Sequence, residues 1–153
     1  MKTEQIPRVF FAAMRRKYTE TEQEGAVAKP VPEVLLEADH FKVLYYLATI
    51  GSYRFERFIV LYDGVPVWTM SCQGLYMENA IPFLRRALLK AYNRREFIGG
   101  RGPRVDTDGE LVYENTVEEG PNSWKRFRGR DRICDGNDQN IGWCEYQGEI
   151  LVE

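Results

Sequence analysis

Three carboxylates in the sequence have the residue type and setting that acid–base chemistry requires. Glu56, Asp131 and Glu145 lie in stretches that alternate between apolar and polar residues as β-strands do. Two acidic groups held in different environments can serve as a general acid and a general base. Charged residues on strands usually face solvent, however. We therefore predict no catalytic residue, and we keep Glu56, Asp131 and Glu145 as the candidates that a hydrolase or an isomerase would use.

The histidine and cysteine residues of the chain give little support for a metal site or a catalytic nucleophile. The chain has one histidine, His40, and three cysteines, Cys72, Cys134 and Cys144. Their spacing matches neither a zinc site nor a disulfide framework. We therefore predict no metal site, no cofactor and reduced thiols in a cytoplasmic protein. A contact between Cys134 and Cys144, and the redox state of all three thiols, are left open.

A row of arginines indicates a second kind of chemistry, the binding of anions. Arg126, Arg128, Arg130 and Arg132 occupy alternate positions of one predicted strand and so share a face. Such a row can bind phosphate, nucleotides or nucleic acid. Alternatively, Glu114 and Glu118 of the preceding predicted strand pair with it across the sheet. Because the net charge of the chain is −2, we favour these ion pairs and do not expect nucleic acid as a partner.

Aromatic residues on the predicted strands form the ligand site that we expect. Tyrosine and tryptophan combine an apolar ring with one polar atom, which suits the wall of a ligand pocket. Packing in the core is the alternative for most of them. The predicted ligand-binding residues are Tyr46, Trp68, Tyr113 and Trp143, with Arg101 as the partner of an anionic group.

The elements that must position these residues begin with a β-hairpin in Tyr53–Gly74. Two runs rich in β-branched and aromatic residues flank Asp63-Gly64, a dipeptide typical of two-residue hairpin turns. Apolar residues at helical spacing predict helices over residues 3–18 and Ile81–Tyr92, with Asn79 capping the second. Residues 19–39 read as a connector. Further strands are predicted at Phe41–Ile50, Glu110–Glu118, Trp124–Cys134 and Ile141–Val152.

The second half of the chain partly repeats the first. At an offset of 72 residues, Phe55 aligns with Phe127, and Asp63-Gly64 aligns with Asp135-Gly136. We therefore predict an α+β fold of two units, each one helix followed by three strands, which form one curved and mainly antiparallel sheet of about six strands with the helices on one face. The whole chain, 1–153, forms one domain: helix and connector in 1–40, first meander and helix in 41–95, second meander in 96–153.

Several motifs in the chain resemble a bacterial family known as domain of unknown function 5680. The motifs, in order, are Phe55, the segment Pro66-Val67-Trp68-Thr69-Met70 with Gly74, Arg101-Gly102-Pro103, Phe127-Arg128-Gly129-Arg130-Asp131 and Tyr146-Gln147-Gly148. Arg57, Ile59 and Glu149 depart from the family pattern. The resemblance implies a bacterial cytosolic protein and a fold type, but no reaction. Family members often carry a helix-turn-helix domain ahead of this region, and the 40 residues before Phe41 are too few for one.

The composition is that of a globular protein without a membrane span. Hydrophobic residues make up 44% of the chain, as in globular proteins, and no window approaches the roughly 20 apolar residues of a membrane span. From the aromatic residues on the strands and the Arg101-Gly102-Pro103 loop, we expect a non-enzymatic small-molecule-binding or regulatory module. We expect no contact with membranes. An enzyme that uses strand carboxylates is one alternative. A protein-interaction module, with a homodimer among its forms, is another.

Overall fold

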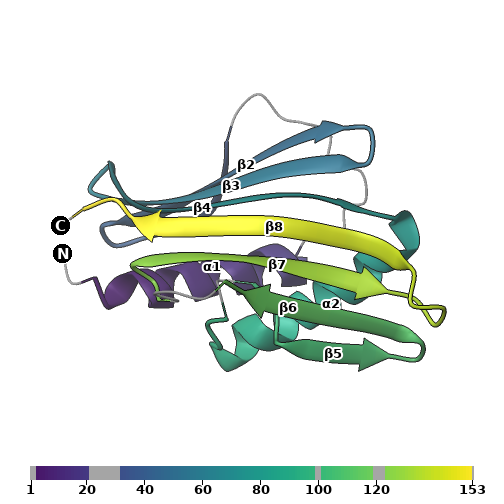
Figure 1. Cartoon of the computed structure of the whole chain (residues 1–153). Coiled ribbons are helices and arrows are strands. Elements are labelled where there is room, and N and C mark those ends of the chain that lie inside the picture. Colours follow the sequence, from purple (N-terminus) through teal and green to yellow (C-terminus); the bar gives the residue numbers. More distant parts are fainter. Residues whose placement is uncertain (1–2, 21–31, 99–100, 119–122, 153) are drawn as a thin grey trace.

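Within the described residues, eight antiparallel strands form one sheet, and both helices pack against the same face of it (Figure 1). The computed structural model describes residues 3–20, 32–98, 101–118 and 123–152. The elements are α1 (Gln5–Glu20), β1 (Glu33–Ala38), β2 (Phe41–Ile50), β3 (Tyr53–Tyr62), β4 (Val65–Tyr76), a short 3₁₀ turn (Glu78–Ala80), α2 (Ile81–Arg94), β5 (Val105–Asp108), β6 (Leu111–Val117), β7 (Arg126–Cys134) and β8 (Asn140–Ile150). The strand order is β1-β2-β3-β4-β8-β7-β6-β5, so two four-stranded meanders meet where β4 pairs with β8.

The hairpin of β3 and β4 forms as its sequence predicts. Asp63 and Gly64 both have positive φ, 48° and 80°, which is the backbone geometry of the turn that matches the twist of the two strands. Strand β2 pairs with β3 along its whole length, from Phe41 opposite Tyr62 to Ile50 opposite Tyr53. The prediction of strand Phe41–Ile50 is therefore confirmed.

Both helices bury the apolar stripes that predicted them. In α1 the side chains of Ile6, Phe10 and Met14 are fully buried, and they recur at intervals of four residues. Helix α2 ends at Arg94 and is capped by Arg95, whose φ of 56° places it in the left-handed region typical of helix termini. The predicted cap at Asn79 is wrong, because Ala80 occupies the capping position and no side chain bonds there.

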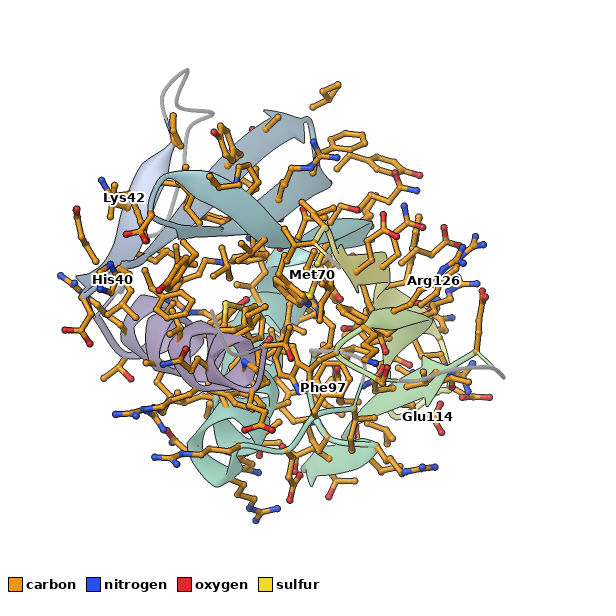
Figure 2. All side chains as sticks on the ribbon, turned by 90° about the vertical axis from the view of Figure 1, so that its left-hand side faces the viewer. His40, Lys42, Met70, Phe97, Glu114 and Arg126 are labelled. Atoms are coloured by element: carbon orange, nitrogen blue, oxygen red, sulfur yellow. The ribbon has the colours of Figure 1, made fainter. Side chains whose placement is uncertain are left out.

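Alternation along the strands divides the sheet into an inner face, covered by the helices, and an outer face turned away from them. Inner-face residues such as Phe58 and Met70 are fully buried. Figure 2 shows Met70 in the middle of the molecule, and Arg126 and Glu114 at its periphery on the side away from α1. Any ligand that approaches the sheet from solvent therefore meets the outer face.

The predicted architecture of two helix-plus-three-strand units and about six strands is wrong. The α+β class and the antiparallel sheet are confirmed, but each helix is followed by four strands in the described residues. The two strands beyond the predicted six, β1 and β5, are the edges of the sheet. For β1, the sequence left open a brief strand or a turn at the apolar patch Val34-Leu35-Leu36, and a strand forms there. Edge strands are short and largely solvated, so they lack the strong alternation that marks a half-buried strand. Residues 21–31 of the predicted connector lie outside the described part of the chain.

The alignment of Phe55 with Phe127 also fails in the structure. Phe55 lies on the outer face and is 39% exposed, whereas Phe127 lies on the inner face and is 4% exposed. Because side chains alternate between faces with a period of two, two aligned residues on opposite faces cannot be equivalent positions of a repeat. The shared turn residues Asp-Gly reflect common hairpin chemistry instead.

Glycines in the central strands make room for aromatic rings of the neighbouring strand. Phe127 lies directly across from Gly148, and Gly129 lies directly across from Tyr146. A Cβ atom at Gly148 would fall against the ring of Phe127 and 2.6 Å from the backbone carbonyl oxygen of Thr69. The ring occupies the space over the glycine, so this part of the inner face depends on the absence of a side chain there.

Substitution Gly148→Ala is therefore expected to destabilise the protein by about 1–3 kcal/mol, because the new methyl group forces a shift of a ring and of the sheet backbone. Urea unfolding of the wild type and the variant measures the change. Glu149→Ala on the exposed side of the same strand is the control, and it should stay within about 0.5 kcal/mol of the wild type. Equal effects of the two substitutions would contradict the prediction.

Candidate functional site

Arg101 is the centre of a buried polar network on the inner face. Its side chain is only 1% exposed, and its Nε donates to Oδ2 of Asp131 at 3.0 Å. Its Nη2 donates to the hydroxyl of Tyr76 at 3.4 Å, and Nη1 contacts the thiol of Cys72 at 3.9 Å. The loop after α2 is thereby fixed to β4 and β7, on both sides of β8.

The buried carboxylate of Asp131 finds its hydrogen-bond donors among the residues around it. Its carboxylate, which is fully buried, accepts hydrogen bonds from the hydroxyls of Tyr76 and Tyr113 as well as from Arg101. Burial, followed by the carboxylate charge, raises the pKa of Tyr76 and Tyr113 well above their ordinary value of 10.0. The tyrosines therefore act as neutral hydrogen-bond donors, and Asp131 has no side that faces solvent.

The amide of Asn115 continues the network to the loop. Its Nδ2 donates to the carbonyl oxygens of Ile98 at 2.8 Å and Gly102 at 3.1 Å, while its Oδ1 accepts from the hydroxyl of Tyr146 at 2.5 Å. Buried polar groups need partners, and here each member supplies one to the next. These bonds hold the Arg101-Gly102-Pro103 turn against β6 and β8.

Glu56 forms the second half of the network, between the sheet and α1. Its Oε1 accepts from the Tyr45 hydroxyl at 2.6 Å and lies 3.2 Å from Nζ of Lys17. Arg54 and Arg101 approach the same carboxylate at 3.7 and 3.9 Å. Burial would raise the pKa of Glu56, but the charges of Lys17, Arg54 and Arg101 outweigh burial and hold it well below its ordinary value of 4.5. Glu56 is therefore ionised at neutral pH and fully engaged.

The outer face contains an open hollow of about 850 Å³ above the central strands. Its size lies within the range of about 300–1,000 Å³ that is usual for ligand pockets. One row of side chains crosses it from β2 to β7, as the strand register requires: Tyr46, Arg57, Ser71, Gln147 and Arg128.

The next row of the outer face supplies further lining residues. It consists of Ala48, Phe55, Gln73 and Glu145, with Arg130 of β7 beyond them. Phe55 is 39% exposed, so its ring is available to a ligand. Small and polar side chains thus form the floor over β4 and β8, and bulkier ones form the walls. This arrangement can hold an organic molecule by ring contacts and hydrogen bonds.

The arginine row of β7 is largely compensated by acids. Arg132 donates to Glu114 at 2.6 Å, and Arg128 forms an ion pair with Glu118 at 3.4 Å. Arg126 and Arg130 lie opposite Glu149 and Glu145 of β8. The predicted pairing with Glu114 and Glu118 is therefore confirmed.

The predicted ligand-binding residues are divided between the two faces of the sheet. Tyr46 and Trp143 lie on the outer face. Tyr46 lines the hollow, and the guanidinium carbon of Arg130 lies over the ring of Trp143, 5.3 Å from its centre. Trp68, Tyr113 and Arg101 lie on the inner face and are at most 1% exposed. The sheet itself separates the two groups, so the five side chains do not form one site.

The three candidate carboxylates are likewise split. Glu56 and Asp131 are bound within the inner network, and Glu145 is exposed on the outer face beside the hollow. His40 is exposed at the turn between β1 and β2, where its Nδ1 lies 2.7 Å from Oδ1 of Asp63. This geometry brings no two of the candidate groups together around a reacting atom.

Three further features of the described residues bear on the predicted partners and on the predicted thiols. They contain no cluster of three or more histidine, cysteine, aspartate or glutamate side chains that could hold a metal ion. No helix among them has the length and apolar character needed to cross a membrane. All three cysteines are free and buried, and Cys144 lies diagonally across from Cys72, not across from Cys134.

Sequence reasoning missed Arg57 and Phe55 as lining residues of the hollow, and Lys17 as a buried cation. The alternation of β3 could have placed Phe55 and Arg57 on one face, opposite Phe58 and Glu56. Lys17 follows two arginines in the sequence, but it comes three residues after Met14 and seven after Phe10, so helical spacing places it on the buried side of α1. Its burial depends on Glu56 and Tyr45, which come from distant parts of the chain.

The fold and the site define an α+β protein with an open eight-stranded antiparallel sheet, a charged network under the sheet and a hollow on the free face. Comparisons with protein-family models, with curated proteins and with solved structures find no match for this chain. The resemblance to domain of unknown function 5680 therefore stays a prediction. The motif residues behind it, including Arg101, Phe127 and Asp131, belong mostly to the inner face.

Proposed function

We propose that this protein is a non-enzymatic binding module that takes up a small organic molecule in the hollow of the outer face. The observation that carries the proposal is the hollow itself, whose lining combines exposed rings with polar side chains from five strands. Such a combination is characteristic of ligand sites, where apolar walls supply contact area and a few polar groups fix the orientation. The cytoplasm, where buried thiols stay reduced, is the compartment that we propose for it.

A binding role is better supported than a hydrolase or an isomerase. General acid–base catalysts work best with a pKa near the working pH, whereas neighbouring cations hold the pKa of Glu56 well below 4.5. Asp131 is enclosed by Arg101, Tyr76 and Tyr113. Both carboxylates thus have structural partners on the inner face, which take up their oxygens.

Filling the hollow is expected to abolish ligand binding without unfolding the protein. Ser71→Trp places a large ring on the floor of the hollow, on a face with room for it. A thermal-shift screen against metabolites should find compounds that raise the melting temperature of the wild type, because a ligand that binds the native state stabilises it. The same compounds should have no effect on Ser71→Trp.

Glu149→Trp is the matched control, since it adds the same ring to the same face outside the lining of the hollow. It should keep the response of the wild type. Two outcomes would refute the proposal: no compound stabilises the wild type, or the compounds that do so stabilise Ser71→Trp equally.

A further inference from the structure

From the charges and rings that line the hollow, we infer that its ligand is a flat-ring organic anion, with the anionic group between Arg57 and Arg128 and the ring on Phe55 and Tyr46. This inference rests on the proposed binding role of the hollow and adds the chemical class of the ligand. It follows from three features of the described residues, which concern the charge, the position and the shape of the lining.

Arg57 carries a positive charge that no neighbouring acid neutralises. Its partners across the sheet are Tyr46 on one side and Ser71 on the other. It forms no ion pair within the described residues, in contrast to Arg128 and Arg132 of β7. An arginine fork without a carboxylate partner, on a surface otherwise rich in paired charges, is available to a carboxylate or a phosphate.

Arg128 faces Arg57 across the hollow along the same row of the sheet. Three strand spacings separate their backbones, roughly 14 Å, and the intervening positions are Ser71 and Gln147. Arg128 pairs with Glu118, and their side chains are 64% and 59% exposed, respectively. Exposed ion pairs of this kind contribute little to the free energy of folding. Arg128 can therefore turn to an anion in the hollow at small cost.

The carboxylates near the hollow do not cancel these two arginines. Glu56 is bound on the inner face by Lys17 and Tyr45. Glu145 lies directly across from Arg130, which supplies a positive charge beside it. With Arg128 paired to Glu118 and Glu145 beside Arg130, the charge of Arg57 remains in excess at the hollow, and this favours anions over cations.

The walls of the hollow determine the rest of the ligand. Phe55 and Tyr46 are 39% and 38% exposed, and they lie on adjacent strands at one side of the floor. Exposed rings of this kind gain from the stacking of a second flat ring. A volume of about 850 Å³ exceeds what an inorganic anion fills, so the ligand has an organic body as well as a charge.

Four probes test the class of ligand: naphthalene-2-carboxylate, naphthalene-2-carboxamide, naphthalen-2-ylmethylamine and inorganic phosphate. The first three share the ring system and differ chiefly in charge. By calorimetric titration at low salt, the carboxylate should bind the wild type about tenfold more tightly than the amine. Phosphate alone should bind more weakly than the carboxylate, because it has no ring to place on Phe55.

Arg57→Gln should weaken the carboxylate about tenfold and leave the carboxamide within about twofold. Arg126→Gln is the matched control, since Arg126 shares the outer face but does not line the hollow. It should leave all affinities unchanged. Unliganded melting temperatures equal to that of the wild type would show that both variants are folded.

The inference is overturned if the amine binds as tightly as the carboxylate, if Arg57→Gln leaves the carboxylate unaffected, if phosphate alone binds as tightly, or if no naphthalene probe binds the wild type. The proposed binding role fails separately. If the metabolite screen finds a neutral or cationic ligand that Ser71→Trp excludes, the binding role stands and the anionic class is wrong. If Ser71→Trp binds every ligand as the wild type does, both are wrong.

Discussion

Arg101→Met is expected to lower the free energy of unfolding by about 3–5 kcal/mol, because it leaves the buried carboxylate of Asp131 without its cation. Asp131 is fully buried and would keep only the hydroxyls of Tyr76 and Tyr113 as donors. Methionine fills much of the space of the arginine stem, so the loss reports on the charge more than on a cavity. Urea unfolding, followed by tryptophan fluorescence, measures it.

The control for this substitution is Arg104→Met, three residues later in the same loop. Arg104 is exposed, and its loss should change the free energy of unfolding by no more than about 0.5 kcal/mol. A double-mutant cycle with Asp131→Asn separates the ion pair from other effects of each change. The two losses should not add, since each residue is the other's partner. Additive losses, or a cost of Arg101→Met as small as that of Arg104→Met, would show that the pair contributes nothing.

The ion pair of Arg101 with the buried Asp131 argues against the predicted role of Arg101 in binding a ligand. Its position in a loop next to glycines suggested an arginine free to meet an anion. A sequence cannot show that a loop folds under a sheet, because the contacts that bury Arg101 come from Asp131, Tyr76 and Cys72, between 25 and 30 residues away. The anion that Arg101 binds is the carboxylate of Asp131 in the same chain.

Elements with strong local signals were predictable, and elements defined by long-range contacts were not. The Asp63-Gly64 turn and strand Phe41–Ile50 follow from turn chemistry and β-branched runs, and the structure reproduces both. Strand β5 has the sequence VDTD, only four residues with little apolar character. It forms because β6 offers a free edge, which no local pattern reveals.

The candidate site was predictable only in part for a related reason. Tyr46 was predicted as a ligand residue, and it does line the hollow. An aromatic residue on a strand has an even chance of facing either side, so the sequence alone did not determine this outcome. The choice of face for Trp68 and Tyr113 required knowing where the helices pack. Arg57 and Phe55 lie on the face left uncovered, so their exposure is a property of the whole fold and not of strand β3 alone.

Glu56→Gln is expected to destabilise the protein by a similar amount, about 3–5 kcal/mol at neutral pH, because it removes the anion that Lys17 and Arg54 share. The glutamine keeps the shape and can still accept from the hydroxyl of Tyr45, so the loss is one of charge. Glu37→Gln is the control: Glu37 pairs with Lys42 at 3.1 Å on the exposed edge strand. It should cost at most about 1 kcal/mol.

The dependence on pH distinguishes the charge of Glu56 from its packing. Its pKa lies well below 4.5 in the folded protein and near 4.5 in the unfolded chain, so the unfolded chain binds more protons as the pH falls through that value. The stabilisation by Glu56 is therefore fully present above about pH 6, and below about pH 4.5 it falls progressively by up to roughly 1.4 kcal/mol per pH unit, so that part of it is lost by about pH 3. Glu56→Gln has no such group, so urea unfolding should show the gap between the wild type and the variant closing as the pH falls. A gap that stays constant from neutral pH to about pH 3 would mean that Glu56 acts through its shape, and that the cations around it are balanced elsewhere.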